Sequence, residues 1–280
     1  MSRSEERIDL LPPESVPGVL LAWSETHLEQ TLAGAPAIAL WRPRGTAVAI
    51  GVSQSSEYDT VPETIRRDGV SLVRRPSGGG SVVLCAGVLC WEAWADLEDV
   101  KRLSGGDNGI RPAYAVLSMP AVNGLRALGV DAFQAGISDI AVNVDNTLRK
   151  LAGTAQLRRR NKTLVHGSLL VNADLSLLGR YLPNPDKAPD YRAGREHDTF
   201  CANVSSLLSD ASDAMATVSG QIRKEALSLG WEVLLPPAEM PPDVEKLARE
   251  KYLAPGWNWE KIRPGNSKRN GYGATNEYTL

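Results

Sequence analysis

The chain has 280 residues, of which 42% are hydrophobic and 23% charged, and its formal net charge is −2. This composition is that of a globular protein with a full core. The near-balanced charge provides no global field to attract nucleic acid or an anionic membrane. No stretch approaches the ~18 apolar residues of a membrane span, and residues 1–14 lack the features of a signal peptide. We therefore expect a cytoplasmic protein with no nucleic-acid partner and no membrane association.

Three cysteines, Cys85, Cys90 and Cys201, are present. An odd number in a chain of this size argues against a disulfide framework. Cys85 and Cys90 lie in an apolar run with no histidine or second cysteine pair nearby, which argues against a zinc site. We expect free thiols and no metal site.

Hydrophobic periodicity predicts the elements of the first third of the chain. A helix is expected at residues 16–33, followed by two strands within residues 37–51. A short helix with a proline in its first turn is expected at residues 62–68. A strand at residues 71–75 then leads into a glycine-rich turn, and residues 81–94 are expected to form two strands with a break between them.

The middle of the chain combines one longer helix with successive strands. Residues 111–128 have helical spacing, and Pro120 is expected to kink this helix. Residues 138–144, 149–158 and 163–172 are predicted to be strands joined by polar turns. Because strands and helices do not alternate regularly, the pattern indicates an α+β fold with a mixed, largely antiparallel sheet and packed helices.

The last third contains fewer strand signals. Residues 184–197 are polar and contain prolines, which predicts a loop, and helices are expected at residues 210–229 and 241–252. We expect one catalytic domain over residues 1–262. Residues 263–280 are rich in glycine, asparagine and charge, which predicts a flexible C-terminal tail.

The most informative segment is Arg-Arg-Pro-Ser-Gly-Gly-Gly-Ser-Val-Val at residues 74–83. Three consecutive glycines allow the backbone to approach a ligand closely and to direct N–H groups at it. An arginine before such a loop can hold a phosphate or carboxylate. The alternative is a plain glycine-rich hairpin turn. The pattern is neither a Walker A loop nor a dinucleotide-binding fingerprint.

Two further segments carry candidate polar residues. Lys150 lies in Arg-Lys-Leu-Ala-Gly-Thr-Ala-Gln at residues 149–156, where small neighbours leave room for a ligand beside the ammonium group. His166 opens the sequence His-Gly-Ser-Leu-Leu-Val-Asn at residues 166–172. A surface lysine and a buried, hydrogen-bonded histidine are the alternatives for these two residues.

In order and spacing, these three segments resemble the lipoate–protein ligase A and octanoyltransferase family. The resemblance extends to residues 40–54, to Gly-Ile-Ser-Asp-Ile at residues 136–140, and to the Glu-Lys-Tyr and Trp-Asn-Trp sequences at residues 250–252 and 257–259. It covers the chain from residue 15 to about residue 262.

The resemblance implies a fold shared with biotin ligases and class II tRNA-synthetase catalytic cores. It implies a lipoate–protein ligase that activates lipoate or octanoate with ATP, supplied with Mg²⁺, to an acyl-AMP. The acyl group then passes to a lysine of a lipoyl-domain or glycine-cleavage-H-like carrier protein. Lys150 is the expected catalytic residue. The residues expected to bind substrate or adenylate are Trp41, Arg75, Gly78, Gly79, Gly80, Ser81, Val82, Asp139, Gly153, His166, Gly167, Ser168 and Leu169. An apolar tunnel for the acyl chain is expected from Val82, Val83 and Leu169.

Two departures from the family pattern lead to expectations of their own. The His-Asp pair common after the glycine loop is replaced by Leu84 and Cys85, so any contact made by that pair is lost or replaced. Ligases with a built-in accessory domain continue well past the Trp-Asn sequence, whereas this chain ends soon after it. We therefore expect that the chain either works with a separate small accessory subunit or belongs to a branch of the family that needs none.

The main alternative is an octanoyl or lipoyl transferase that uses an acyl-carrier donor and a cysteine thioester. The position expected for the nucleophilic cysteine, around residues 132–134, has none, which favours the ligase. Cys201 follows a loop that contains His197, but its apolar surroundings favour a structural role. A biotin ligase and a non-catalytic carrier-binding protein are weaker alternatives.

Overall fold

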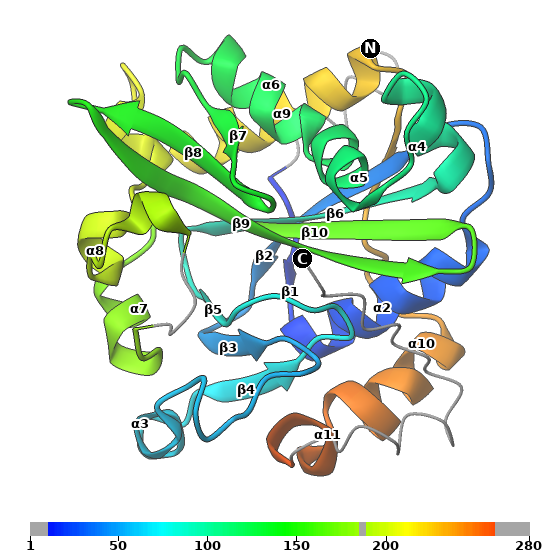
Figure 1. The fold of residues 1–280 in the computed structure, drawn as a ribbon. Helices are drawn as coiled ribbons and strands as arrows, with labels where there is room; N and C mark the ends of the chain where they lie inside the picture. The colour runs from blue at the N-terminus through cyan, green and yellow to red at the C-terminus, as the bar shows by residue number, and fades with distance from the viewer. Residues whose placement is uncertain (1–10, 185–188, 261–280) are drawn as a thin grey trace.

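The computed structural model describes residues 11–184 and 189–260, and it contains two β-sheets. The larger has the strand order β1-β2-β6-β10-β9-β8-β7, with β11 also pairing with β2; the smaller has the order β4-β3-β5 (Figure 1). Most pairs are antiparallel, and the parallel ones are β1 with β2, β11 with β2, and β3 with β4. The predicted α+β fold with a mixed, largely antiparallel sheet is confirmed. The strands are β1 Glu14–Ser15, β2 Ala37–Pro43, β3 Ala47–Ile50, β4 Ser71–Arg74, β5 Val82–Leu84, β6 Val88–Asp96, β7 Phe133–Ala135, β8 Asp139–Val144, β9 Thr147–Arg159, β10 Lys162–Leu170 and β11 Glu232–Leu234.

Helices cover both faces of the larger sheet. Helices α5, α6 and α9 lie on one face, with a core that includes Trp91 and Leu169 (Figure 1). On the other face the sheet packs against α2 and the smaller sheet, with a second core that includes Trp94. The helices are α2 Pro17–Gln30, α3 Pro62–Arg67, α4 Leu97–Leu103, α5 Ile110–Leu117, α6 Met119–Ala127, α7 Ser176–Tyr181, α8 His197–Phe200, α9 Ala214–Ser228, α10 Pro242–Leu247 and α11 Pro255–Trp259, with 3₁₀ turns η1 Asp190–Arg192 and η2 Val204–Leu207 and a π-helix η3 Ala248–Tyr252.

Three expectations about local structure are corrected. The helix expected at residues 111–128 is two helices, because Ser118 ends α5 and Pro120 occupies the first turn of α6. The helix expected at residues 241–252 becomes the π-helix η3 in its second half. The loop expected at residues 184–197 contains η1. The expected tail at residues 263–280 and the domain boundary at residue 262 lie outside the described residues.

Two pairs of consecutive strands are divided between the sheets, one strand of each pair in either sheet. The strands within residues 37–51 do not pair with each other, since β2 joins the larger sheet and β3 the smaller. The same holds within residues 81–94, where β5 and β6 part at the predicted break. A gap between the sheets therefore lies beside the glycine-rich turn that connects β4 to β5.

Arg74 ties the smaller sheet to the C-terminal part of the described chain. Its side chain is fully buried, and its guanidinium donates hydrogen bonds to three carbonyls at residues 51–54 and to three at residues 257–260. The Arg74 N–H also donates to Asn258 Oδ1 at 2.8 Å, and Trp257 Nε1 donates to the Arg74 carbonyl at 2.7 Å. One side chain thus provides hydrogen-bond donors for the backbone carbonyls of two segments that are not paired in a sheet.

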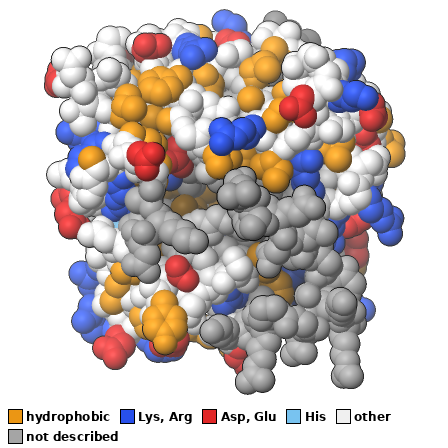
Figure 2. Space-filling model, in the orientation of Figure 1, with side chains coloured by type: hydrophobic (Ala, Val, Ile, Leu, Met, Phe, Trp, Pro, Cys, Tyr) orange, Lys and Arg blue, Asp and Glu red, His pale blue; other side chains and the backbone are white. Residues whose placement is uncertain are grey.

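The surface shows no large separation of charge on the face seen in Figure 2, where acidic and basic side chains are interspersed. Within residues 11–184 and 189–260, no helix has the length and apolar character needed to cross a membrane.

Replacing Arg74 by alanine is expected to lower the free energy of unfolding by about 3–4 kcal/mol, because several buried carbonyls lose their donor at once. Urea denaturation followed by circular dichroism would measure it. Arg67→Ala is the control, since the Arg67 side chain is 67% exposed and pairs with Asp68 at the surface; its effect should stay within about 0.5 kcal/mol. A loss below about 1 kcal/mol for Arg74→Ala would contradict the role assigned to Arg74.

Candidate functional site

A cavity of about 140 Å³ lies between the two sheets. Its floor is formed by alternate residues of the larger sheet, and its opposite wall by short apolar side chains of the smaller sheet. The first turns of α2 close one end. The floor is made by Trp41, Cys90, Glu92, His166, Ser168, Gly153 and Ala155; the opposite wall by Ala49, Val73, Val82 and Leu84; and the closed end by Pro17 and Leu21.

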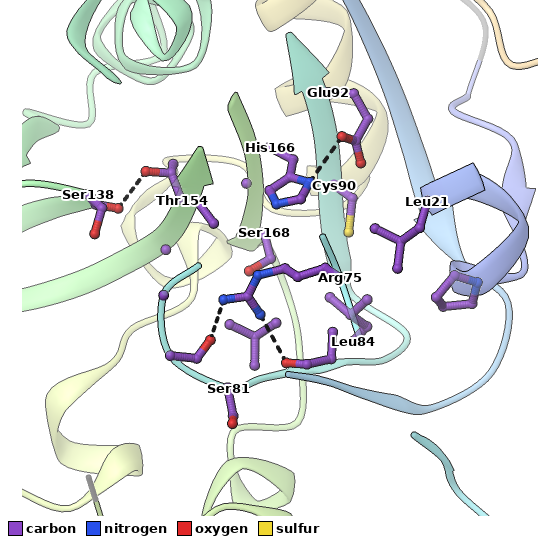
Figure 3. A pocket seen from close by; sticks show the side chains of 18 of the residues that line it. Leu21, Arg75, Ser81, Leu84, Cys90, Glu92, Ser138, Thr154, His166 and Ser168 are labelled. Carbon is purple, nitrogen blue, oxygen red and sulfur yellow. Dashed lines mark hydrogen bonds and ion pairs between the residues drawn. The ribbon is translucent and has the colours of Figure 1, made fainter. Parts of the chain in front are cut away.

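The glycine-rich loop borders this cavity and is shaped by Arg75. The Arg75 guanidinium donates to the Ser77 hydroxyl and to the carbonyls of Ala49, Gly78 and Gly80, as Figure 3 shows in part. Burial lowers the pKa of Arg75 to about 10, which leaves it charged at neutral pH. These donors hold the loop, so Arg75 supports the anion-binding shape expected of this segment mainly by ordering its backbone.

Gly79 adopts a left-handed conformation, with φ +87°. A Cβ at this position would lie 3.0 Å from an Arg75 nitrogen. The loop therefore needs glycine here for its backbone angle, and a side chain would strain it further.

Lys150 is held at the side of the cavity by an ion pair. Its Nζ lies 2.7 Å from Asp139 Oδ1, and Tyr191 donates its hydroxyl proton to Asp139 Oδ2 at 2.7 Å. Burial raises the pKa of Tyr191, which keeps this hydroxyl protonated and able to donate. A Cβ on Gly153 would lie 3.0 Å from Lys150 Nζ, so the small residue makes room for the ammonium group.

A second, larger cavity of about 830 Å³ adjoins the first. The two share the lining residues Gly80, Ser81, Val82, Ser138, Asp139, Lys150, Gly153 and Ser168. Lys150 therefore lies where a narrow, largely apolar cavity opens into a wider chamber whose lining has a larger polar share. The far wall of that chamber comes from residues 182–184, 189–192 and 197–201.

Cys201 is brought beside Lys150 by the backbone. The two residues form an isolated parallel β-bridge, and the Ala202 N–H donates to the Lys150 carbonyl at 2.9 Å. Cys201 lines the larger cavity and is 6% exposed. Burial raises the pKa of its thiol, although the positive charges of Lys150 and Arg192 partly offset this. The Cys201 N–H donates to the His197 carbonyl at 2.9 Å, whereas His197 Nε2 lies 3.1 Å from the Pro183 carbonyl.

A buried polar chain runs along the floor of the first cavity. Arg75 Nε donates to Ser77 Oγ at 3.1 Å, and Ser77 Oγ lies 2.5 Å from His166 Nε2. His166 Nδ1 faces Glu92 Oε2 at 3.3 Å, and Trp41 Nε1 donates to Glu92 Oε1 at 3.3 Å. Figure 3 shows His166 and Glu92 side by side on adjacent strands.

Most of the residues expected at the site are brought together. The exceptions are Gly78, which lies just outside the cavity, and Leu169. Because side chains on a strand alternate, Leu169 points to the helix-covered face and is fully buried in the other core. The expectation that Leu169 forms the tunnel wall is therefore wrong. The expected residues that line the cavity are Trp41, Arg75, Gly79, Gly80, Ser81, Val82, Asp139, Lys150, Gly153, His166, Gly167 and Ser168.

Two polar residues of the site, Glu92 and Tyr191, and the position of Cys201 beside Lys150 were not predicted from the sequence. Glu92 had a usable signal, since it is the one acidic residue inside the apolar run at residues 88–95. Tyr191 and the closeness of Cys201 to Lys150 had none, because both depend on how residues 189–201 fold back over β9. Val83, expected in the acyl tunnel, lines the larger cavity instead of the narrow one.

No group of three or more histidine, cysteine, aspartate or glutamate side chains suited to a metal ion occurs among the residues that the structure describes.

Several solved structures have a similar fold and are described as lipoate protein ligases or lipoate complexes. The chain superposes with a TM-score of 0.69 on a bipartite lipoate protein ligase from Thermoplasma acidophilum, at 24% identity over 90% of this chain and 97% of that one. A lipoate-protein ligase A bound with ATP gives 0.67 at 25% identity, covering 90% and 98%. P. falciparum LipL1 in complex with lipoate gives 0.65 at 19% identity, covering 90% and 73%. The fold is that of the lipoate ligases.

The sequence gives the family directly. Residues 17–225 match the model of the lipoyl protein ligase A/B catalytic domain. The chain belongs to this family, as the three ordered motifs indicated.

The raised pKa of Cys201 leads to a pH prediction. A pKa above the usual value leaves the thiol neutral at pH 7.5, so iodoacetamide should alkylate Cys201 in the folded protein at least about tenfold more slowly than a cysteine in a short peptide. The rate should climb as the pH rises above 9. Peptide mapping by mass spectrometry separates Cys201 from Cys85 and Cys90. A rate equal to that of the peptide at pH 7.5 would show an ionised, open thiol.

Proposed function

We propose that the chain is an ATP-dependent lipoate–protein ligase. The observation that carries the proposal is the position of Lys150 between a narrow cavity and a wide chamber. The narrow cavity suits an acyl chain, and the chamber has room for a nucleotide and for the lysine of a carrier protein. The reacting acyl carbon would then lie beside Lys150.

The chemistry fits the residues at this junction. In the proposed first step the lipoate carboxylate attacks the α-phosphate of ATP, supplied as its Mg²⁺ complex, and pyrophosphate leaves. In the second, a carrier lysine attacks the acyl carbonyl, and AMP leaves. Both steps develop negative charge next to the Lys150 ammonium, which Asp139 holds in place and for which Gly153 leaves room. A fixed cation aimed at developing charge is an effective way to lower such barriers.

The solved relatives support the substrates and the carrier. One lipoate-protein ligase A is bound with ATP, and LipL1 is in complex with lipoate. The T. acidophilum ligase was described together with its E2 lipoyl domain. We therefore propose a lipoyl domain, or a glycine-cleavage-H-like protein, as the acyl acceptor of this chain.

Lys150→Ala should lower the rate of acyl-adenylate formation about 10²–10³-fold, because one electrostatic stabiliser of the transition state is removed. Pyrophosphate release with lipoate and ATP measures the first step. Lys101→Ala, an exposed lysine on α4, is the matched charge control and should keep the wild-type rate. A wild-type rate in Lys150→Ala, with an unchanged thermal midpoint, would remove Lys150 from the mechanism.

We also propose that a separate small accessory subunit assists activation, a proposal supported by the bipartite relative. The purified chain should then form little acyl-adenylate alone, and addition of the accessory subunit should restore it. The assay combines the chain with ATP, Mg²⁺, lipoate and a lipoyl domain, with mass spectrometry of the lipoyl domain. Complete lipoylation by the chain alone, at catalytic concentration, would refute the need for a subunit.

A second candidate function is transfer of an octanoyl or lipoyl group through a thioester. The bridge between Lys150 and Cys201 favours it, because it puts a thiol at the wall of the same chamber. In this mechanism the Cys201 thiolate would attack a carrier thioester and release the carrier thiol. The buried position and raised pKa of Cys201 oppose this route.

The two candidates differ in one measurable species. We expect Cys201→Ser to keep most of the ligase activity, and no acyl adduct to accumulate on the wild-type protein. Intact-protein mass spectrometry after incubation with octanoyl-carrier protein, without ATP, tests both. An octanoyl adduct that disappears in Cys201→Ser would replace the ligase with the transferase.

A further inference from the structure

A buried carboxylate lies inside the cavity proposed for the acyl chain. Glu92 is in the middle of β6, where every residue is buried, and only 2% of it is exposed. Its side chain faces the cavity together with Cys90 (Figure 3). An acidic group in a cavity that otherwise suits an apolar chain costs desolvation energy, so its presence calls for a physical explanation.

The hydrogen bonding of Glu92 is incomplete among the described residues. Oε1 accepts one long hydrogen bond, from Trp41 Nε1 at 3.3 Å. Oε2 makes no hydrogen bond and only faces His166 Nδ1 at 3.3 Å. A carboxylate offers about four acceptor sites, and a buried one normally uses several of them. Glu92 therefore keeps unused acceptor capacity at the wall of the cavity.

The strand register places Cys90 across the cavity floor from Lys150, and Glu92 lies two residues further along β6. Lys150 stands over Gly153 on β9. From there the floor crosses β10 to β6, where Gly153 is in register with Ser168 and Ser168 with Cys90. Two interstrand spacings amount to about 10 Å. That distance is close to the length of an extended eight-carbon acyl chain, so a chain whose carboxyl carbon lies at Lys150 ends beside Cys90 and Glu92.

We propose that Glu92 is a specificity-determining residue, which selects an acyl substrate whose far end carries hydrogen-bond donors. The inference rests on the proposed function and names its substrate more closely. The dithiol form of the lipoyl group is an eight-carbon acyl group with two S–H donors near the end remote from its carboxyl carbon. The cyclic disulfide and the plain octanoyl chain have none.

The energetic reason is the fate of the Glu92 carboxylate when the cavity fills. A chain without donors packs against the Glu92 carboxyl group and leaves its unused acceptor sites without a partner, which is unfavourable. A dithiol at the same position supplies S–H donors to the Glu92 carboxyl group. The polar chain through His166, Ser77 and Arg75 keeps the carboxylate fixed for this contact.

The test is the affinity of the full chain for three free acids, measured by calorimetry. Dihydrolipoate is measured with a phosphine reductant, lipoate without it, and octanoate under both conditions. The wild-type protein should bind dihydrolipoate at least about tenfold more tightly than lipoate or octanoate, which is the size of one hydrogen bond to a charged group. The ratio of dihydrolipoate to lipoate affinity is the readout, since the two differ in their S–H donors.

Two variants test the assignment to Glu92. Glu92→Gln keeps the shape, and Glu92→Val suits a strand; in both, the ratio should fall towards one, and in Glu92→Val octanoate should bind more tightly than to wild type. Glu98→Gln, which removes the charge of an exposed carboxylate on α4 away from both cavities, is the matched control and should retain the wild-type ratio. Circular dichroism and thermal melting check that each variant is folded.

The outcomes separate this inference from the proposed function. A wild-type ratio near one, or an unchanged ratio in folded Glu92→Gln, overturns the role of Glu92. If octanoate and lipoate are then still activated and transferred, the ligase assignment stands. If the wild-type protein, with any required subunit, binds and activates none of the three acids, both proposals fail.

Discussion

The burial of Arg74 is the constraint on which the geometry of the site depends. Its guanidinium is surrounded by neutral carbonyls from two segments that no strand would otherwise hold. A buried cation is tolerated only when its donors are satisfied, so both segments must be in place for the smaller sheet to be stable. The next residue, Arg75, repeats the arrangement within the glycine-rich loop. The hydrogen bonds of Arg74 and Arg75 thus fix the irregular backbone segments that border the cavity.

The two sheets contribute different kinds of surface to the site. The larger sheet supplies the charged and polar side chains Lys150, His166 and Glu92, each from a different strand. Pairing with the neighbouring strands fixes their positions. The smaller sheet supplies apolar surface and backbone. Because the two surfaces come from separate sheets, the space between them is set by loop lengths and by the Arg74 contacts, and only indirectly by strand pairing.

Sequence patterns predicted much of the fold for definite physical reasons. Periodicity located the long strands and helices, and the three ordered motifs placed Lys150 beside the glycine-rich loop. The patterns did not reveal that consecutive strands, such as β2 and β3, join different sheets, because strand propensity does not specify a partner. The face of Leu169 was misjudged because a continuous apolar run has no alternation to read. Tyr191 was out of reach because its contact with Asp139 spans 52 residues.

Helix α2 connects the narrow cavity with the end of the described chain. Pro17 and Leu21 close the cavity, and Glu25, one turn further along, accepts from Lys251 Nζ at 2.8 Å and from the Tyr252 hydroxyl. The position of α2 therefore affects two equilibria, the filling of the cavity and the docking of the C-terminal helices. Thermodynamic linkage makes such coupling reciprocal. In the function proposed above, an acyl chain that holds α2 in place would also favour the docked C-terminal helices, and loosening those helices would weaken acyl-chain binding to the same extent.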